Sequence, residues 1–178
     1  MKHVIEKRPI REEVLTELKW DLSDLYKSDD EWHTALNVLE NDIKRLDAFK
    51  GQLHTGPATL LNCLLLEEKL LMQLTKLSTY AYLKESADRT DPVIQANSSK
   101  ISALGTKVHA ALSFIHNEIL SFEEGTIEKY LTAEIKLEPF RKSLLEILKK
   151  RQHTLSPETE ETLLHSAKFI VPPTKFTA

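Results

Sequence analysis

Histidines and a single cysteine are the side chains of this 178-residue sequence best suited to metal binding or nucleophilic chemistry. The seven histidines are His3, His33, His54, His109, His116, His153 and His165. None is followed by glutamate, so the H-E-x-x-H motif, in which two histidines on one helix face bind zinc, is absent. The sequence therefore offers no zinc site of the H-E-x-x-H type.

Three pairs of side chains come closest to a metal site: Asp30 with His33, Glu161 with His165, and His109 with His116. The first pair has a carboxylate-x-x-His spacing similar to that of di-metal bundles, but no second such pair accompanies it. The second pair is spaced for a surface contact on one helix face. The third pair is two helical turns apart, which is typical of ordinary surface or boundary histidines. We therefore predict no metal ligand in this chain.

The remaining catalytic patterns are also missing. Cys63 lies in the leucine-rich stretch "LLNCLLLEE", which predicts a buried, unreactive thiol. The four glycines are scattered, so there is no phosphate-binding loop, and no serine has the context of a nucleophile elbow. We predict no catalytic, cofactor-binding or metal-binding residue in this chain and no bound cofactor.

Composition narrows the class of protein further. The 24 basic and 27 acidic residues give a net charge of −3 and form no basic block, which argues against nucleic acid as a partner. No stretch approaches the ~18 apolar residues of a membrane span. The charged start "MKHVIEKRPIREE" is unlike a signal peptide, and one cysteine cannot form an internal disulfide. These features predict a cytoplasmic protein with no membrane partner.

Helical periodicity dominates the sequence from residue 28 onward. "SDDE" has the pattern of a capping box, in which Ser28 and Glu31 reciprocally bond each other's backbone amides. The apolar stripe that follows is Trp32, Ala35, Leu36, Leu39, Ile43, Leu46 and Phe49. We expect Gly51 to end this helix.

Two long helices are expected next, at residues 59–84 and 93–120. Pro57 suits the first turn of one, and Asp91 suits the cap of the other. The inward residues expected are Leu60, Leu61, Leu64, Leu65, Leu71, Leu74, Leu77, Ala81 and Tyr82, then Ile94, Ile101, Leu104, Val108, Ala111, Leu112 and Ile115. Gly105 either weakens the second helix or permits a close crossing.

Shorter helices are expected in the last third. One carries Ile127, Tyr130, Leu131 and Ile135, a second follows Pro139, and a third opens at Ser156. No strand pattern occurs, so the predicted fold is all-α: a helical bundle with two long antiparallel helices plus shorter helices. The expected organisation is an extended N-terminal arm (1–27), a helical domain (28–168) and a divergent C-terminal tail (169–178).

Five strings carry a family resemblance in consistent order and spacing. They are "LTELKWDLSDLYKSDDEW", "FKGQL", "LTKLSTYAYLKESADRTDP", "ALSFIHNEIL" and "KKRQHTLSPETEETLL". Together, over residues 14–166, they resemble the N-terminal region of oligoendopeptidase F, a family of zinc metallopeptidases that includes thimet oligopeptidase. The final residues, "KFIVPPTKFTA", depart from the family pattern.

The resemblance implies a bowl of helices that admits short peptides to a channel, where a zinc-bound water cleaves them. The zinc ligands and the general base of that family lie in its catalytic half, and no position here matches them. The resemblance therefore implies an N-terminal lid and substrate-channel domain that is inactive alone, with a catalytic domain as its partner and oligopeptides as substrates of the full enzyme. A fragment separated from its catalytic half should also expose apolar surface, so we expect self-association through that surface. The alternatives are a stand-alone helical protein-interaction module and an independent metal or small-molecule bundle.

The aromatic stretch before the first helix allows two interpretations. We expect Trp20, Leu22, Leu25 and Tyr26 to pin the arm across the helix ends, with Asp21, Ser23 and Asp24 forming local turns. In the second interpretation, Trp20 or Trp32 faces the peptide channel or the missing half.

Overall fold

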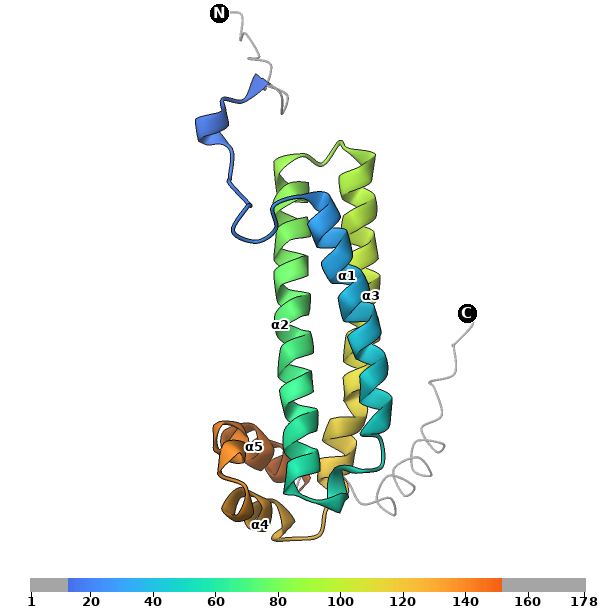
Figure 1. Ribbon diagram of the computed structural model, residues 1–178, viewed down its shortest axis with the longest axis vertical. Helices are drawn as coiled ribbons and strands as arrows, with labels where there is room; N and C mark the ends of the chain where they lie inside the picture. The colour runs from blue at the N-terminus through green and yellow to red at the C-terminus, as the bar shows by residue number, and fades with distance from the viewer. Residues whose placement is uncertain (1–12, 152–178) are drawn as a thin grey trace, which may run out of the picture. The chain divides into compact units, whose positions relative to one another are not determined.

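The computed structural model describes residues 13–151, and all of their regular elements are helical (Figure 1). In chain order these are η2 (Thr16–Leu18), α1 (Asp29–Lys44), η3 (Arg45–Ala48), η4 (Leu53–Thr55), α2 (Pro57–Ala87), α3 (Pro92–Ser121), α4 (Thr126–Ala133), η5 (Ile135–Phe140) and α5 (Arg141–Arg151), where η denotes a 3-10 helix. The all-α prediction is confirmed. The helix expected at Ser156, the boundary at 168 and the 169–178 tail lie outside the described residues.

The start of α1 uses the expected capping pattern with one change of partner. Ser28 Oγ accepts a hydrogen bond from the Glu31 amide at 3.2 Å, as predicted. The Glu31 carboxylate, however, accepts from the amide of Lys27 at 2.7 Å rather than from that of Ser28. The long glutamate side chain thus reaches one residue further back, which ties the incoming arm to the first turn of α1.

The end of α1 differs from the prediction. The α-helix stops at Lys44 and tightens into η3, a common way for a helix to end. Gly51 lies beyond η3 and has a φ of 70°, which favours glycine, so it forms a later turn rather than the helix stop. Glu118 of α3 accepts hydrogen bonds from the amides of Gly51 and Leu53 at 2.5 Å and 3.3 Å, which holds this connection in place.

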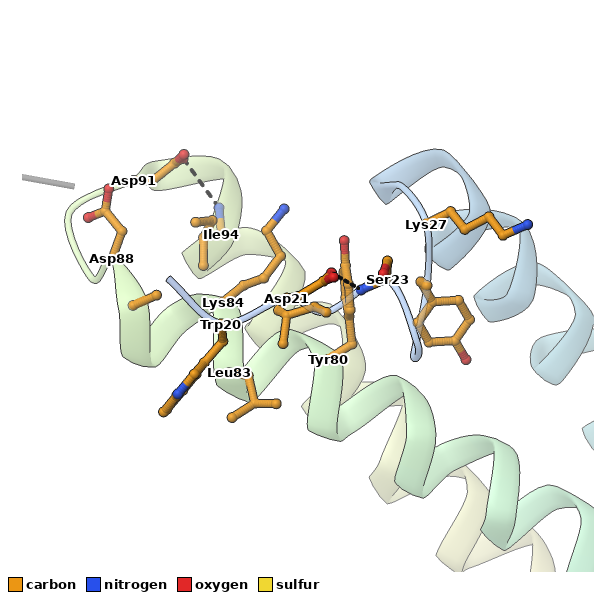
Figure 2. A pocket seen from close by; sticks show the side chains of 13 residues that line it. Trp20, Asp21, Ser23, Lys27, Tyr80, Leu83, Lys84, Asp88, Asp91 and Ile94 are labelled. Atoms are coloured by element: carbon orange, nitrogen blue, oxygen red, sulfur yellow. Dashed lines mark hydrogen bonds between the residues drawn. The ribbon is translucent and has the colours of Figure 1, made fainter. Parts of the chain in front are cut away.

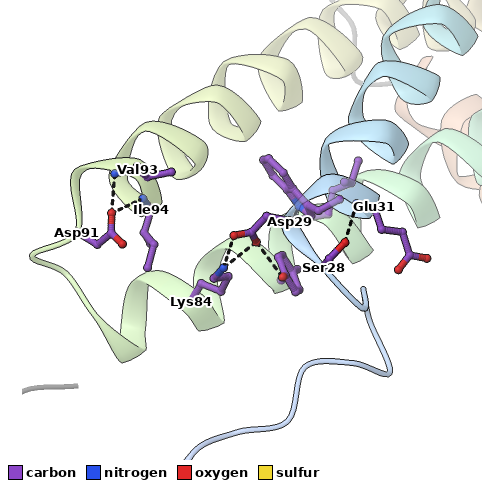
Figure 3. Close-up of polar contacts among 10 residues, drawn as sticks. Ser28, Asp29, Glu31, Lys84, Asp91, Val93 and Ile94 are labelled. Atoms are coloured by element: carbon purple, nitrogen blue, oxygen red, sulfur yellow. Dashed lines mark hydrogen bonds and ion pairs between the residues drawn. The ribbon is translucent and has the colours of Figure 1, made fainter. Parts of the chain in front are cut away.

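The two long helices begin where the sequence predicts. Pro57 occupies the first turn of α2, and the Asp91 carboxylate accepts hydrogen bonds from the amides of Val93 and Ile94 at the start of α3 (Figure 3). A four-residue turn joins the two helices, so they run in opposite directions, and α1 lies alongside them (Figure 1). Gly105 of α3 faces Leu74 of α2, where an added Cβ would lie 3.7 Å from the leucine side chain.

The chain divides into two compact units, residues 1–118 and 119–178. The largest fully buried side chains of the first unit are Trp32, Leu36, Leu39, Leu46, Leu53, Leu60, Leu70 and Leu77. Two residues expected to face inward do not: Leu65 is 46% exposed and Tyr82 is 65% exposed, while Leu66 and Tyr80 are buried instead. Helix α2 packs against both α1 and α3, so its buried face is wider than one apolar stripe. A prediction from a single stripe therefore assigns the residues at the borders of this face wrongly.

In the second unit α4, η5 and α5 contact one another. Ile127, Leu131, Leu137 and Leu144 are buried there. Ile135 was expected on the apolar face of the helix before Pro139, but α4 ends at Ala133 and Ile135 is 82% exposed at the start of η5. The Arg151 guanidinium donates hydrogen bonds to the backbone carbonyls of Leu120 and Phe122, which satisfies acceptors at the end of α3.

Candidate functional site

A pocket of about 440 Å³ lies between the arm and the ends of α2 and α3 that meet at their connecting turn (Figure 2). Residues 20–23 and Tyr26 form the arm side. Leu83, Lys84 and Ile94 belong to the helical side. All of the lining residues belong to the first unit.

An aromatic cluster fixes the arm to the helices beside this pocket. The buried Tyr26 ring packs edge-to-face on Tyr80 of α2, with ring centroids 5.4 Å apart. Tyr80 also stacks on Trp32 of α1, with ring centroids 6.4 Å apart, and the Trp32 indole donates a hydrogen bond to the carbonyl of Leu77 at 3.0 Å. The Lys76 ammonium lies 4.8 Å from the centre of the Tyr26 ring, an additional cation–π contact.

An ion pair joins α1 and α2 next to the same cluster. Lys84 Nζ lies 2.6 Å and 2.7 Å from the two carboxylate oxygens of Asp29, and the Tyr80 hydroxyl donates to the same carboxylate at 2.9 Å (Figure 3). Burial alone would raise the pKa of Asp29, but the bonds from Lys84 and Tyr80 outweigh it and lower that pKa. Burial, followed by the hydrogen bond to Asp29, raises the pKa of Tyr80 to about 12. The Lys84 charge is therefore already matched.

Trp20 does not have the anchoring role predicted from the sequence. Its side chain is 61% exposed and lines the pocket, whereas Leu22 and Leu25 are half-buried. Tyr26 is the buried aromatic residue of the arm, and Trp32, 1% exposed, is the buried tryptophan. The anchor hypothesis is thus right for Tyr26 and wrong for Trp20.

Three carboxylates line the pocket and are oriented by local hydrogen bonds. Asp21 accepts a hydrogen bond from the Ser23 amide at 2.9 Å, and its bonds to Ser23 lower its pKa. Asp88 accepts from the amide and the hydroxyl of Thr90 through one oxygen, Oδ1, at 2.8 Å and 2.7 Å. Asp91 likewise uses Oδ1 for both amides that it caps. The pocket therefore combines acidic groups with an exposed indole.

The histidines do not form a metal centre in the part of the chain that the structure describes. Between residues 13 and 151, no three or more His, Cys, Asp or Glu side chains are grouped so that they could hold a metal ion. His33 packs against Trp32, while His109 is exposed and His116 half-buried. His3, His153, His165 and Glu161 lie outside the described residues, and the prediction that this chain has no metal ligand stays a prediction.

Cys63 is buried, as predicted. Burial, with smaller effects from the charges of Glu67 and Glu118, raises the pKa of its thiol to about 12. The thiolate, which is the reactive form, is therefore scarce at neutral pH. None of the described helices is both long enough and apolar enough to cross a membrane.

The pocket is the feature that sequence reasoning missed. Each aspartate has a short local motif, Asp-x-Ser, Asp-x-Thr or Asp-Pro, that predicts a turn or a cap. Nothing in these motifs indicates that the turn at residues 21–23 lies opposite the turn at 88–91.

Comparisons with known proteins agree with the resemblance. A sequence profile of the family described as Oligopeptidase F matches residues 118–170. The chain is 31% identical to Oligopeptidase PepF of Bacillus subtilis, over 92% of this chain and 24% of the relative. It is 27% identical to an oligoendopeptidase F homolog of Lactococcus lactis, over 93% of this chain and 28% of the relative. The chain thus spans about a quarter of the length of these relatives.

Solved structures agree in fold. An oligoendopeptidase-F from Enterococcus faecium matches with a TM-score of 0.64 and 30% identity, over 79% of this chain and 28% of that one. A putative peptidase from Chlamydophila abortus matches with a TM-score of 0.71 and 26% identity, over 90% of this chain and 27% of that one. By sequence and by fold, the chain belongs to the oligoendopeptidase F family and corresponds to the N-terminal domain of its members.

Proposed function

We propose that this chain is the N-terminal helical part of an oligoendopeptidase F-like zinc metallopeptidase, acts in the cytoplasm and shapes the access of short peptides to a separate catalytic half. The observation that carries the proposal is the match over most of this chain to about a quarter of each relative. In the family that this chain resembles, zinc and the hydrolytic water would belong to the catalytic half; the described residues group no three His, Cys, Asp or Glu side chains that could hold a metal.

Exposed apolar side chains support a docking role for α2. Leu65 and Met72, the latter 66% exposed, are seven residues apart and so lie on one face of the helix. Exposed apolar surface of this kind favours association, either with a catalytic half or with a second copy of the chain. We expect the isolated chain to self-associate, and a strictly monomeric profile in sedimentation velocity would contradict this. The double substitution Leu65→Gln/Met72→Gln should weaken self-association, whereas Val93→Gln, exposed on α3, is the matched control.

The decisive test is reconstitution. The chain would be mixed with a catalytic half from the same source, and cleavage of a quenched fluorescent oligopeptide would be followed, together with zinc content. We expect cleavage from the mixture and neither cleavage nor bound zinc from this chain alone. Turnover by the isolated chain would overturn the proposal. An inactive mixture in which the chain still binds another protein would instead favour the alternative, a stand-alone interaction module.

A further inference from the structure

Helix α5 of the second unit has an apolar side that the described residues cover only in part. Leu144 is buried, but Leu145 and Leu148, three residues apart on the helix, are half-buried. Both line a pocket of about 310 Å³, whose other residues come from the turn at 123–125, from α4 and from the end of α5. Two leucines on one side of a helix are removed from water only when a further segment packs on them.

The chain leaves the described region at the edge of this pocket. Arg151, the last residue of α5, lines the pocket, and its guanidinium donates hydrogen bonds to the carbonyls of Leu120 and Phe122. The residues that follow therefore start beside the pocket, from a position that these bonds fix.

The length of the following segment allows it to turn back over α5. The four residues 152–155 can span up to about 13 Å. A helix over residues 156–170 would be about 22 Å long, against about 16 Å for the 11 residues of α5. The segment can therefore cover the whole apolar side of α5.

The apolar pattern of this segment suits such a cover. The helix expected from Ser156 onward carries Leu163, Leu164, Ala167 and Ile170 on one side, at the spacing of a single apolar stripe. The family profile runs without a break over residues 118–170, so the segment belongs to the same family unit as α4 and α5.

The charges of the pocket and of the segment are complementary. The charged residues that line the pocket are Glu123, Glu124, Glu128, Lys149 and Arg151. Three carboxylates against two cations leave an excess of one negative charge. Residues 162–178 contain Lys168 and Lys175 but no aspartate or glutamate, and Lys168 borders the apolar stripe of the expected helix. A segment docked through that stripe therefore brings a cation to an acidic pocket.

We propose that residues 162–170 lie across α5 and cover Leu145 and Leu148, so that the chain completes the core of its own second unit. The apolar side of α5 is then interior surface and is not offered to a partner. The exposed apolar residues of α2, Leu65 and Met72, remain available for association. This assignment does not depend on the proposed function.

Cysteine labelling of the full chain tests whether the pocket is covered. Leu148→Cys in a Cys63→Ser background has a single thiol in the pocket, and Leu65→Cys in the same background has a matched thiol on exposed surface. We expect a disulfide reagent to react at least about tenfold more slowly at position 148, because a covered thiol reacts only after local opening. Equal rates at the two positions would overturn the proposal.

Substitutions in the segment identify it as the cover. Leu163→Asp/Leu164→Asp places charge in the apolar stripe and should raise the labelling rate at position 148 by about tenfold. Thr162→Asp/His165→Asp, on the opposite side of the expected helix, is the matched control and should leave that rate unchanged. Native Cys63, buried in the first unit, should stay unreactive in both double variants. An equal response of position 148 to the two double variants would refute the assignment.

Disulfide cross-linking gives a direct measure of proximity. In the Cys63→Ser background, Leu148→Cys would be combined in turn with Leu163→Cys, Ala167→Cys and Ile170→Cys under mild oxidation. At least one pair should form an intramolecular disulfide, because the bond requires the two Cα atoms to lie within about 7 Å. The pair with His165→Cys, on the opposite side of the expected helix, should not. Absence of a cross-link from all three stripe positions would overturn the proposal.

Other occupants of the pocket give different results. Protection of position 148 that increases with protein concentration, with cross-links between chains, would assign the cover to a second copy. Protection that appears only after a catalytic half is added would assign it to that half. Either result overturns the proposal. None of these readouts involves peptide cleavage, so failure of the proposed function leaves them unaffected.

Discussion

The Lys84 ammonium lies within 2.7 Å of both carboxylate oxygens of Asp29, and Tyr80 donates a hydrogen bond to the same carboxylate. These contacts join the first turn of α1 to the last turns of α2. They also place a lowered-pKa carboxylate beside the aromatic cluster that holds the arm.

The Asp29–Lys84 pair should make stability depend on pH in the acid range. Because the pKa of Asp29 is lowered in the folded state, its contribution is present above the unfolded pKa of about 4 and is lost as the pH falls through the folded value. Asp29→Asn should lower the free energy of unfolding at pH 7 by about 1 kcal/mol or less, since the pair is partly exposed. Urea denaturation at pH 7 and pH 2.5 would measure the free energy of unfolding of the unsubstituted chain and of Asp29→Asn. A deficit as large at pH 2.5 as at pH 7 would contradict the assignment.

Truncation of the two tryptophans should change the free energy of unfolding by very different amounts. Trp32→Ala removes a side chain that is buried against Tyr80 and hydrogen-bonded to Leu77, and should cost about 3–5 kcal/mol of unfolding free energy. Trp20→Ala should change that free energy by about 0.5 kcal/mol or less, because its side chain is mainly in solvent. Urea denaturation of both variants would measure these changes in the free energy of unfolding. Similar decreases in the two variants would mean that Trp20 also anchors the arm.

Alanine at Gly105 should stabilise the protein. The added Cβ would meet Leu74 at 3.7 Å, an ordinary van der Waals distance, while the helix gains about 0.5–1 kcal/mol from the loss of glycine. Gly125→Ala is the matched control: its φ of 81° strains any side chain, so this change should destabilise. Thermal melts of the two variants should shift in opposite directions, and a destabilised Gly105→Ala would show that α2 and α3 pack too tightly there for a methyl group.

Cys63 should be inert in the folded protein. With a thiol pKa of about 12 and no exposed surface, it should react with a disulfide reagent at pH 8 only after unfolding. As a control, Leu65→Cys in a Cys63→Ser background places a cysteine on the exposed face of α2. This thiol should react with the same reagent in the folded protein, without unfolding. Rapid labelling of native Cys63 would indicate local opening of α2.

Structural features that depend only on neighbouring residues, such as helix caps and helix starts, were predictable from the sequence. Ser28 caps α1, Pro57 opens α2 and Asp91 caps α3 as expected, because each interaction spans only two or three residues or follows from a fixed φ. The family resemblance was also readable, because it depends on the order of short strings. The capping partner of Glu31 was misassigned by one residue, since a flexible side chain can reach either amide.

Features that join distant segments were decided by the tertiary structure. Whether Trp20 or Trp32 is buried depends on which of them meets Tyr80, and which side of α2 is exposed depends on where α1 and α3 approach it. The pocket exists only because the turns at residues 21–23 and 88–91 face each other. The sequence alone therefore determined the helices and their starts, through local hydrogen bonds and periodic apolar residues, and the family, through the order of its short strings. Long-range packing determined the anchor, the exposed faces and the candidate site, because contacts between remote segments leave no local pattern.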